Sequence, residues 1–182
     1  EHTIRAIGIL SRIETGDLVA EHPLETKVVH EIASREVLYV ALLLHDIAKG
    51  RGGNHSDLGA EVATKLCPRL GLSPEQTETV AWLVRHHLFM SETFAKRDLG
   101  DPKTIIDFVD VVQSPERLRL LLCLTVADIR AVGPGRWNNW KASLLRDLYH
   151  RAESFMSGGL MKDGRDSAAA AIVLSLRKVL KD

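Results

Sequence analysis

Seven histidine and aspartate residues of this 182-residue chain stand out as candidate metal ligands, because several of them end apolar stretches. His45 and Asp46 follow the apolar run 37–44, where an imidazole and a carboxylate are costly to bury unless something pairs with both. The other members are His2, His55, His86, His87 and Asp128. Imidazole and carboxylate ligands without a thiolate suit one or two divalent cations such as Mn, Fe, Mg or Zn.

Apolar residues at helical spacing lead up to three of these positions. Leu38, Leu42 and His45 fall at i, i+4 and i+7, so we expect His45 on the buried face of a helix. Asp128 stands where a leucine stripe would continue, and a cation would compensate its buried charge. His87 ends a third stripe in the same way. One histidine on an apolar face is usually a core residue, but three helix ends of this kind together indicate a metal centre.

Other residues give weaker signals. His55, in a glycine-rich loop, could equally belong to a turn before a helix. Lys49 follows the His-Asp pair by one helical turn, so it could contact a phosphoryl oxygen or donate a proton, or only complement the helix dipole. The segment 50–53 has neither Walker A spacing nor a preceding strand, which excludes a P-loop. Trp137 and Trp140 are expected to anchor the following helix, with a nucleobase contact as a lesser alternative.

Composition excludes some classes of protein. The 24 basic and 24 acidic side chains balance, so nothing in the bulk charge indicates a nucleic-acid partner or a membrane surface. The apolar run 37–44 is far shorter than the roughly 20 residues of a membrane span. Cys67 and Cys123, without a CxxC motif, predict reduced core thiols in a cytoplasmic protein. The chain starts within a helical pattern and without Met, so we expect it to be a domain of a longer protein.

The elements that must position these side chains are helices, because no stretch shows sustained period-two alternation. Ser73, Asp101 and Ser114 each precede a proline, a pattern typical of a helix N-cap, and Gln76 would complete a capping box. The sequence predicts an all-α bundle with helices near 1–14, 26–49, 56–70, 74–88, 102–112, 115–132, 138–156 and 167–180. We expect a metal-dependent phosphohydrolase domain over 1–156, followed by a linker loop and a C-terminal helix over 157–182.

The order His…His-Asp…His…His-His…Asp resembles the HD superfamily of metal-dependent phosphohydrolases. The segments 45–56, 82–87 and 124–131 look like the HD domains found in bifunctional uridylyltransferase/uridylyl-removing enzymes. The resemblance runs from about residue 2 to about residue 152. His22, His30 and His150 lie outside the pattern and are assigned to the core or the surface.

The resemblance implies an all-α HD-domain helical bundle that hydrolyses the uridylyl-tyrosine phosphodiester of the PII nitrogen-signalling protein. It implies a first metal, Mn or Fe before Mg or Zn, held by His2, His45, Asp46 and Asp128. A second ion would be bridged by Asp46 and completed by His55, His86 and His87. Asp46 and Lys49 are the expected catalytic residues, with water as the nucleophile. The nucleotidyltransferase and regulatory domains of such enzymes have no counterpart in these 182 residues.

Three alternatives stay open at this point. The same chemistry could act on free nucleotides or alarmones, since the ligand set does not distinguish these substrates. A metal-stabilised signalling module without catalysis, or a scaffold without metal, would be a different class of protein.

Overall fold

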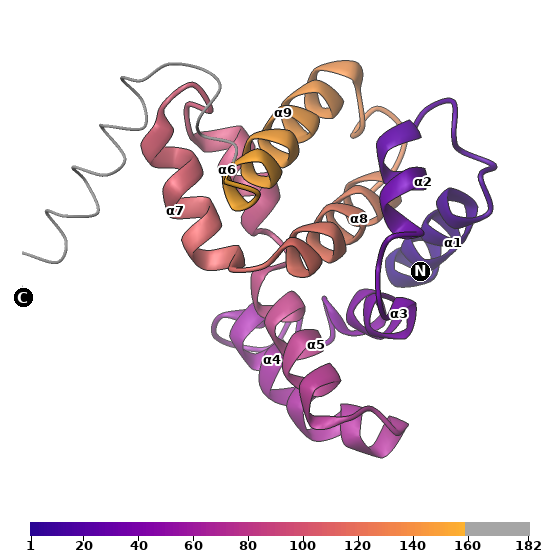
Figure 1. The fold of residues 1–182 in the computed structure, drawn as a ribbon. Helices are drawn as coiled ribbons and strands as arrows, with labels where there is room; N and C mark the ends of the chain where they lie inside the picture. Colours follow the sequence, from indigo (N-terminus) through magenta and orange to yellow (C-terminus); the bar gives the residue numbers. More distant parts are fainter. Residues whose placement is uncertain (159–182) are drawn as a thin grey trace, which may run out of the picture.

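The computed structural model describes residues 1–158, and these fold into helices joined by short loops, with no strand in that range (Figure 1). The predicted all-α class is therefore confirmed. The helices are α1 (His2–Glu14), α2 (Pro23–Val29), α3 (Arg35–Leu44), α4 (His55–Leu66), the 3₁₀ turn η1 (Cys67–Leu70), α5 (Pro74–His86), α6 (Phe89–Lys96), α7 (Pro102–Val112), α8 (Pro115–Ala131) and α9 (Asn139–Met156). The helix predicted near 167–180 lies outside the described residues.

Helix α8 is the centre of the fold. It contacts α1, α2, α3, α5, α6, α7 and α9, which surround it in Figure 1. Its middle is buried on every side: the buried residues are Leu118, Leu120, Leu121, Leu122, Cys123, Leu124, Thr125, Val126, Ala127 and Ala131. A helix that is apolar all round belongs in a core. Asp128 therefore follows directly on the most enclosed segment of the described chain, near the end of a helix that neighbouring elements hold in place.

Helices α4 and α5 form a hairpin that extends below α3 in Figure 1. Gly71 closes the turn between them with a φ of 89°, a left-handed conformation that suits glycine. The predicted capping box begins α5: Ser73 Oγ accepts from the Gln76 amide, and Gln76 Oε1 accepts from the Ser73 amide. Inside the hairpin, Gly59 lies so close to α5 that an added Cβ would stand 2.9 Å from Val84 Cγ1. This contact fixes α5, which also packs on α3.

The helix predicted over 26–49 is wrong in detail, because the chain forms two helices there. Helix α2 ends at Val29, and Ser34 caps a new helix, with its Oγ 3.4 Å from the Val37 amide. The segment 30–34 has neither glycine nor proline, so it lacks the usual sequence signal for a break. Helix α3 ends at Leu44, so His45 and Asp46 lie in the turns that follow. The short helix α6 was not predicted at all.

Two predictions about single residue types have different outcomes. Cys67 and Cys123 are free and buried, as predicted, and burial raises the pKa of the Cys67 thiol. Trp137 is half-buried and packs against the core, whereas Trp140 is 63% exposed and does not anchor the fold. Among the described residues, no helix has both the length and the apolarity needed to cross a membrane.

Candidate metal centre

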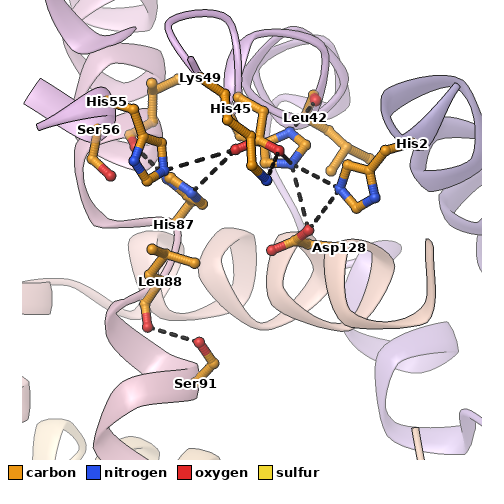
Figure 2. Close-up of polar contacts among 12 residues, drawn as sticks. His2, Leu42, His45, Lys49, His55, Ser56, His87, Leu88, Ser91 and Asp128 are labelled. Atoms are coloured by element: carbon orange, nitrogen blue, oxygen red, sulfur yellow. Dashed lines mark hydrogen bonds and ion pairs between the residues drawn. The ribbon is translucent and has the colours of Figure 1, made fainter. Parts of the chain in front are cut away.

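His2, His45 and Asp128 meet where α1 begins, α3 ends and α8 approaches its last turn (Figure 2). His2 Nε2 lies 2.9 Å from Asp128 Oδ1 and 3.3 Å from His45 Nε2. The distance from His45 Nε2 to Asp128 Oδ1 is 3.5 Å. Three atoms with lone pairs thus converge from segments that are up to 126 positions apart in the sequence.

A second group forms around Asp46. Its Oδ1 lies 3.8 Å from His55 Nε2 and 3.9 Å from His87 Nε2, and the two imidazole rings are 5.3 Å apart. Asn54 caps α4 by accepting from the Ser56 amide, so the His55 side chain is not needed as a cap and turns toward the group instead (Figure 2). The loop thus ends at the N-cap Asn54, and His55 is the first residue of α4.

Asp46 belongs to both groups. Its Oδ2 is 3.7 Å from His45 Nε2, and possible ligand atoms of His2, His45 and Asp46 lie within 4.8 Å of one another. Possible ligand atoms of Asp46, His55 and His87 satisfy the same limit. The rings of His45 and His87 are 5.4 Å apart, which makes the two groups neighbours. The arrangement fits two adjacent cations that share one carboxylate.

Backbone carbonyls orient the two buried rings. His45 Nδ1 is 2.7 Å from the Leu42 carbonyl oxygen, and His87 Nδ1 is 2.7 Å from the Val84 carbonyl oxygen. A carbonyl only accepts hydrogen bonds, so each Nδ1 carries the proton and donates it. When such a ring is neutral, its Nε2 has a lone pair facing the centre, which is the form that binds a metal.

The charges of the centre fit a cation. Burial lowers the pKa of His87, which favours the neutral ligand form. Burial also opposes the charge on Asp46, but Lys49 and His45 outweigh it and hold the pKa of this carboxyl below its ordinary value. For Asp128, burial likewise opposes the charge, but the pairing with His45 outweighs it and lowers the pKa of the carboxyl. The same pairing raises the pKa of His45 in spite of its burial, so in the absence of a cation the two side chains hold a proton between them. Nitrogen lone pairs and carboxylate oxygens that converge within 4 Å repel one another unless a proton or a cation lies between them.

The centre opens to solvent through a recess of about 490 Å³, lined among others by His2, Lys49, Leu88 and Asp128. Lys49 Nζ lies 2.7 Å from Asp46 Oδ2, and its side chain is 67% exposed. A structural metal site usually has closed coordination, whereas this one faces an open recess beside the exposed ammonium group of Lys49. The geometry therefore leaves room for a substrate next to the ligands.

Six of the seven residues proposed as ligands lie together, and His86 does not. The His86 ring packs against Trp82, with ring centroids 4.9 Å apart, and against Phe89 at 6.0 Å. Neither group of possible ligands among the described residues includes it. His87 Nε2 faces Asp46, whereas the ring of His86, the last residue of α5, packs on aromatic side chains instead. The carbonyls of Leu42 and Val84 were not foreseen, because any residue type supplies a carbonyl.

Comparison with known proteins identifies the family of this chain. The family model described as HD domain matches residues 1–130. A bifunctional uridylyltransferase/uridylyl-removing enzyme of Azospirillum brasilense is 66% identical over 182 residues, which is 100% of this chain and 20% of the relative. The enzyme of the same name from Novosphingobium aromaticivorans is 62% identical over 182 residues, again 100% and 20%. That of Rhodospirillum rubrum is 62% identical over 170 residues, which is 93% of this chain and 18% of the relative. The chain thus spans about a fifth of these relatives.

Proposed function

Because the chain belongs to the HD domain family, a family of metal-dependent phosphohydrolases, we propose that it is a hydrolase that removes UMP from the uridylyl-tyrosine of PII signal proteins. The observation that carries this proposal is Asp46, whose carboxylate belongs to two adjoining groups of ligands beside an open recess. A centre of this kind suits hydrolysis of a phosphodiester by water.

The donor set limits what the centre can hold. His2, His45, Asp46 and Asp128 are the proposed ligands of one ion, and Asp46, His55 and His87 those of a second. We propose Mn or Fe, since the ligands are nitrogen and oxygen atoms without sulfur. Bound there, divalent cations supply Lewis acidity, which neutralises phosphoryl oxygens and makes hydroxide available from water near neutral pH.

Lys49 is the proposed proton donor to the leaving tyrosine oxygen. Its ammonium group pairs with Asp46 and is otherwise exposed at the recess. The tyrosine phenoxide is a moderately good leaving group, with a reference pKa of about 10, so a neighbouring ammonium can provide the proton it needs. Hydrolysis breaks the bond between phosphorus and the tyrosine oxygen and releases UMP.

The names of the relatives support the removal of a uridylyl group. Each is a bifunctional uridylyltransferase/uridylyl-removing enzyme, and each is more than 60% identical to this chain over nearly all of the 182 residues. The balanced charge of the chain gives no support to a nucleic-acid substrate. Buried free thiols fit the reducing conditions of the cytoplasm, where we place the activity.

The test compares substrates and metals on the 182-residue chain. Chelator-treated protein is reloaded with Mn, its metal content is measured by elemental analysis, and UMP release from uridylylated PII is followed beside turnover of bis-p-nitrophenyl phosphate, free nucleotides and alarmones. We expect about two equivalents of metal and chelator-sensitive release of UMP. Asp46→Asn should abolish both, while Asp57→Asn, which changes an exposed carboxylate paired with Arg85, should keep both.

The other outcomes identify what replaces the proposal. If free nucleotides or alarmones are hydrolysed while uridylylated PII stays intact, the substrate belongs to that class instead. Metal binding without turnover of any substrate would assign the centre a structural role in a signalling module. Failure to bind any divalent ion would contradict the centre itself.

A further inference from the structure

A second recess adjoins the mouth of the metal centre. It has a volume of about 600 Å³ and lies between α1, the end of α8 and the loop that follows. Arg5 and Ala131 line this recess and also line the smaller recess that contains His2 and Asp128. The two hollows are therefore neighbours on either side of Arg5 and Ala131, and a substrate whose phosphate is at the centre is close enough to extend toward the second one.

The second recess has the chemistry of a nucleoside site rather than of a bare apolar hollow. Arg5, Arg12 and Arg130 line it together with one carboxylate, that of Glu21, and the indole of Trp137. Guanidinium groups donate hydrogen bonds and stack on planar rings, and an indole offers a face for a base. Pockets for small ligands combine, in the same way, an aromatic surface with a few fixed polar groups.

Arg130 is held by a buried support that a surface arginine does not need. Its Nη1 lies 2.7 Å from Glu21 Oε2 and 2.6 Å from His22 Nε2. The side chains of His22 and Glu25 are 0% and 1% exposed, and His22 Nδ1 is 3.6 Å from Glu25 Oε2. Burying an imidazole and a carboxylate is costly. The buried pair fixes the position of Arg130 at the rim of the recess.

Trp137 is held by the same support. Its ring packs against that of His22, with centroids 5.2 Å apart, while it also lines the recess. The loop that brings it there turns at Gly133 and Gly135, which have φ values of 136° and 78°. His22 therefore positions both the guanidinium of Arg130 and the indole of Trp137.

We propose that this recess binds the nucleoside part of the substrate, with the uracil ring against Trp137; the proposal rests on the proposed function. Uracil presents two carbonyl acceptors on either side of an N–H donor. Arg130 and Arg12 can donate to the carbonyls, and Glu21 can accept from the N–H. Arg5, which lines both hollows, lies on the path between phosphate and base. Recognition of uracil would then select uridylylated substrates over other phosphodiesters.

Binding of the product tests the site without relying on catalysis. Isothermal titration calorimetry on the Mn-loaded chain compares UMP with inorganic phosphate, so that the difference isolates the nucleoside. We expect UMP to bind at least about tenfold more tightly, the usual gain from one base stacked on an aromatic ring. Trp137→Ala should remove most of this difference, and Arg130→Gln should reduce it. Trp140→Ala, which changes a neighbouring exposed tryptophan outside the recess, is the matched control and should keep it.

A second experiment measures the specificity for uridine-containing phosphodiesters. Uridine 5′-(p-nitrophenyl phosphate) and bis-p-nitrophenyl phosphate share a leaving group, so the ratio of their kcat/KM values reports recognition of the nucleoside. In Trp137→Ala this ratio should fall about tenfold, because KM for the uridine substrate rises. An equal loss on both substrates would mean that Trp137 is only structural, and equal binding of UMP and phosphate by the unmodified chain would refute the site. If UMP binds in a Trp137-dependent manner but no phosphodiester is hydrolysed, the nucleoside site stands and the proposed function fails.

Discussion

At the scale of single residues, the two buried histidines of the centre are built in the same way. His45 and His87 each follow the last residue of a helix, and each donates from Nδ1 to the carbonyl three positions earlier. A carbonyl at a helix end has no amide partner within the helix, so it is available to an imidazole. One local hydrogen bond thus satisfies the helix end and also fixes the ring for metal binding.

The first prediction separates His87 from its neighbour. His87→Ala removes a proposed ligand of the second ion, so we expect the metal content to fall from two equivalents to about one. His86→Ala removes a ring that packs on Trp82 and should leave the metal content unchanged. Elemental analysis of both variants, with circular dichroism as a control for folding, checks this. Loss of one equivalent in His86→Ala instead would restore His86 to the ligand set.

Lys49 gives a prediction that depends on the leaving group. A general acid contributes about 10²–10⁴-fold where the leaving oxygen needs a proton. Lys49→Ala should therefore slow release of UMP from uridylyl-tyrosine by about 100-fold. Hydrolysis of a p-nitrophenyl ester, whose leaving group is stable as an anion, should be slowed much less. If both substrates lose the same factor, Lys49 acts through its ion pair with Asp46 and not as a proton donor.

At the scale of elements, the ligands come mainly from helix ends. His2 and His55 are the first residues of α1 and α4, whereas His45 and His87 directly follow α3 and α5. Asp128 lies within α8 but also near a helix end, three residues before Ala131. Ends can converge where the bodies of helices, about 10 Å in diameter, cannot. The centre therefore depends on how helices pack more than on the sequence within any one of them.

The contact between α4 and α5 gives a prediction about packing. In Gly59→Ala the new Cβ would meet Val84 Cγ1 at 2.9 Å, so the helices must separate, at a cost of about 1–3 kcal/mol. Val84 also provides the carbonyl for His87, so metal affinity should fall as well. Gly8→Ala in α1 is the control, because nothing lies within 4 Å of its added Cβ, and it should gain about 0.5–1 kcal/mol. Urea unfolding and metal titration measure both effects.

The sequence predicted helix beginnings better than interruptions. Ser73, Asp101 and Ser114 cap helices as expected, because a capping side chain and a following proline act locally. The break at 30–34 and the helix α6 were missed, since tertiary packing decides them and no glycine or proline marks them. For the same reason the pair His86-His87 suggested two ligands: sequence spacing shows adjacency, but only packing shows which ring faces the centre.

At the scale of the whole molecule, the centre connects parts of the chain that are far apart. His2, His45 and Asp128 come from α1, the end of α3 and α8, which all pack on one another. A cation that binds the folded state alone stabilises it by about 2.7 kcal/mol at 100 times its Kd. We therefore expect EDTA to lower Tm by about 5–10 °C for a chain of this size. Differential scanning calorimetry with and without Mn measures this, and an unchanged Tm would contradict a site that spans these helices.

Because α8 is buried, backbone amides on the two sides of the metal centre should exchange with deuterium at different rates. Amides of a segment enclosed on every side exchange with deuterium only when the whole protein unfolds, whereas amides beside an open recess can exchange through local opening. Asp128 follows the enclosed segment of α8, while His2 lines the open recess, and their side chains are 16% and 29% exposed. The α8 side of the metal centre is therefore the more rigid one, and ions would enter and leave on the more exposed side of His2.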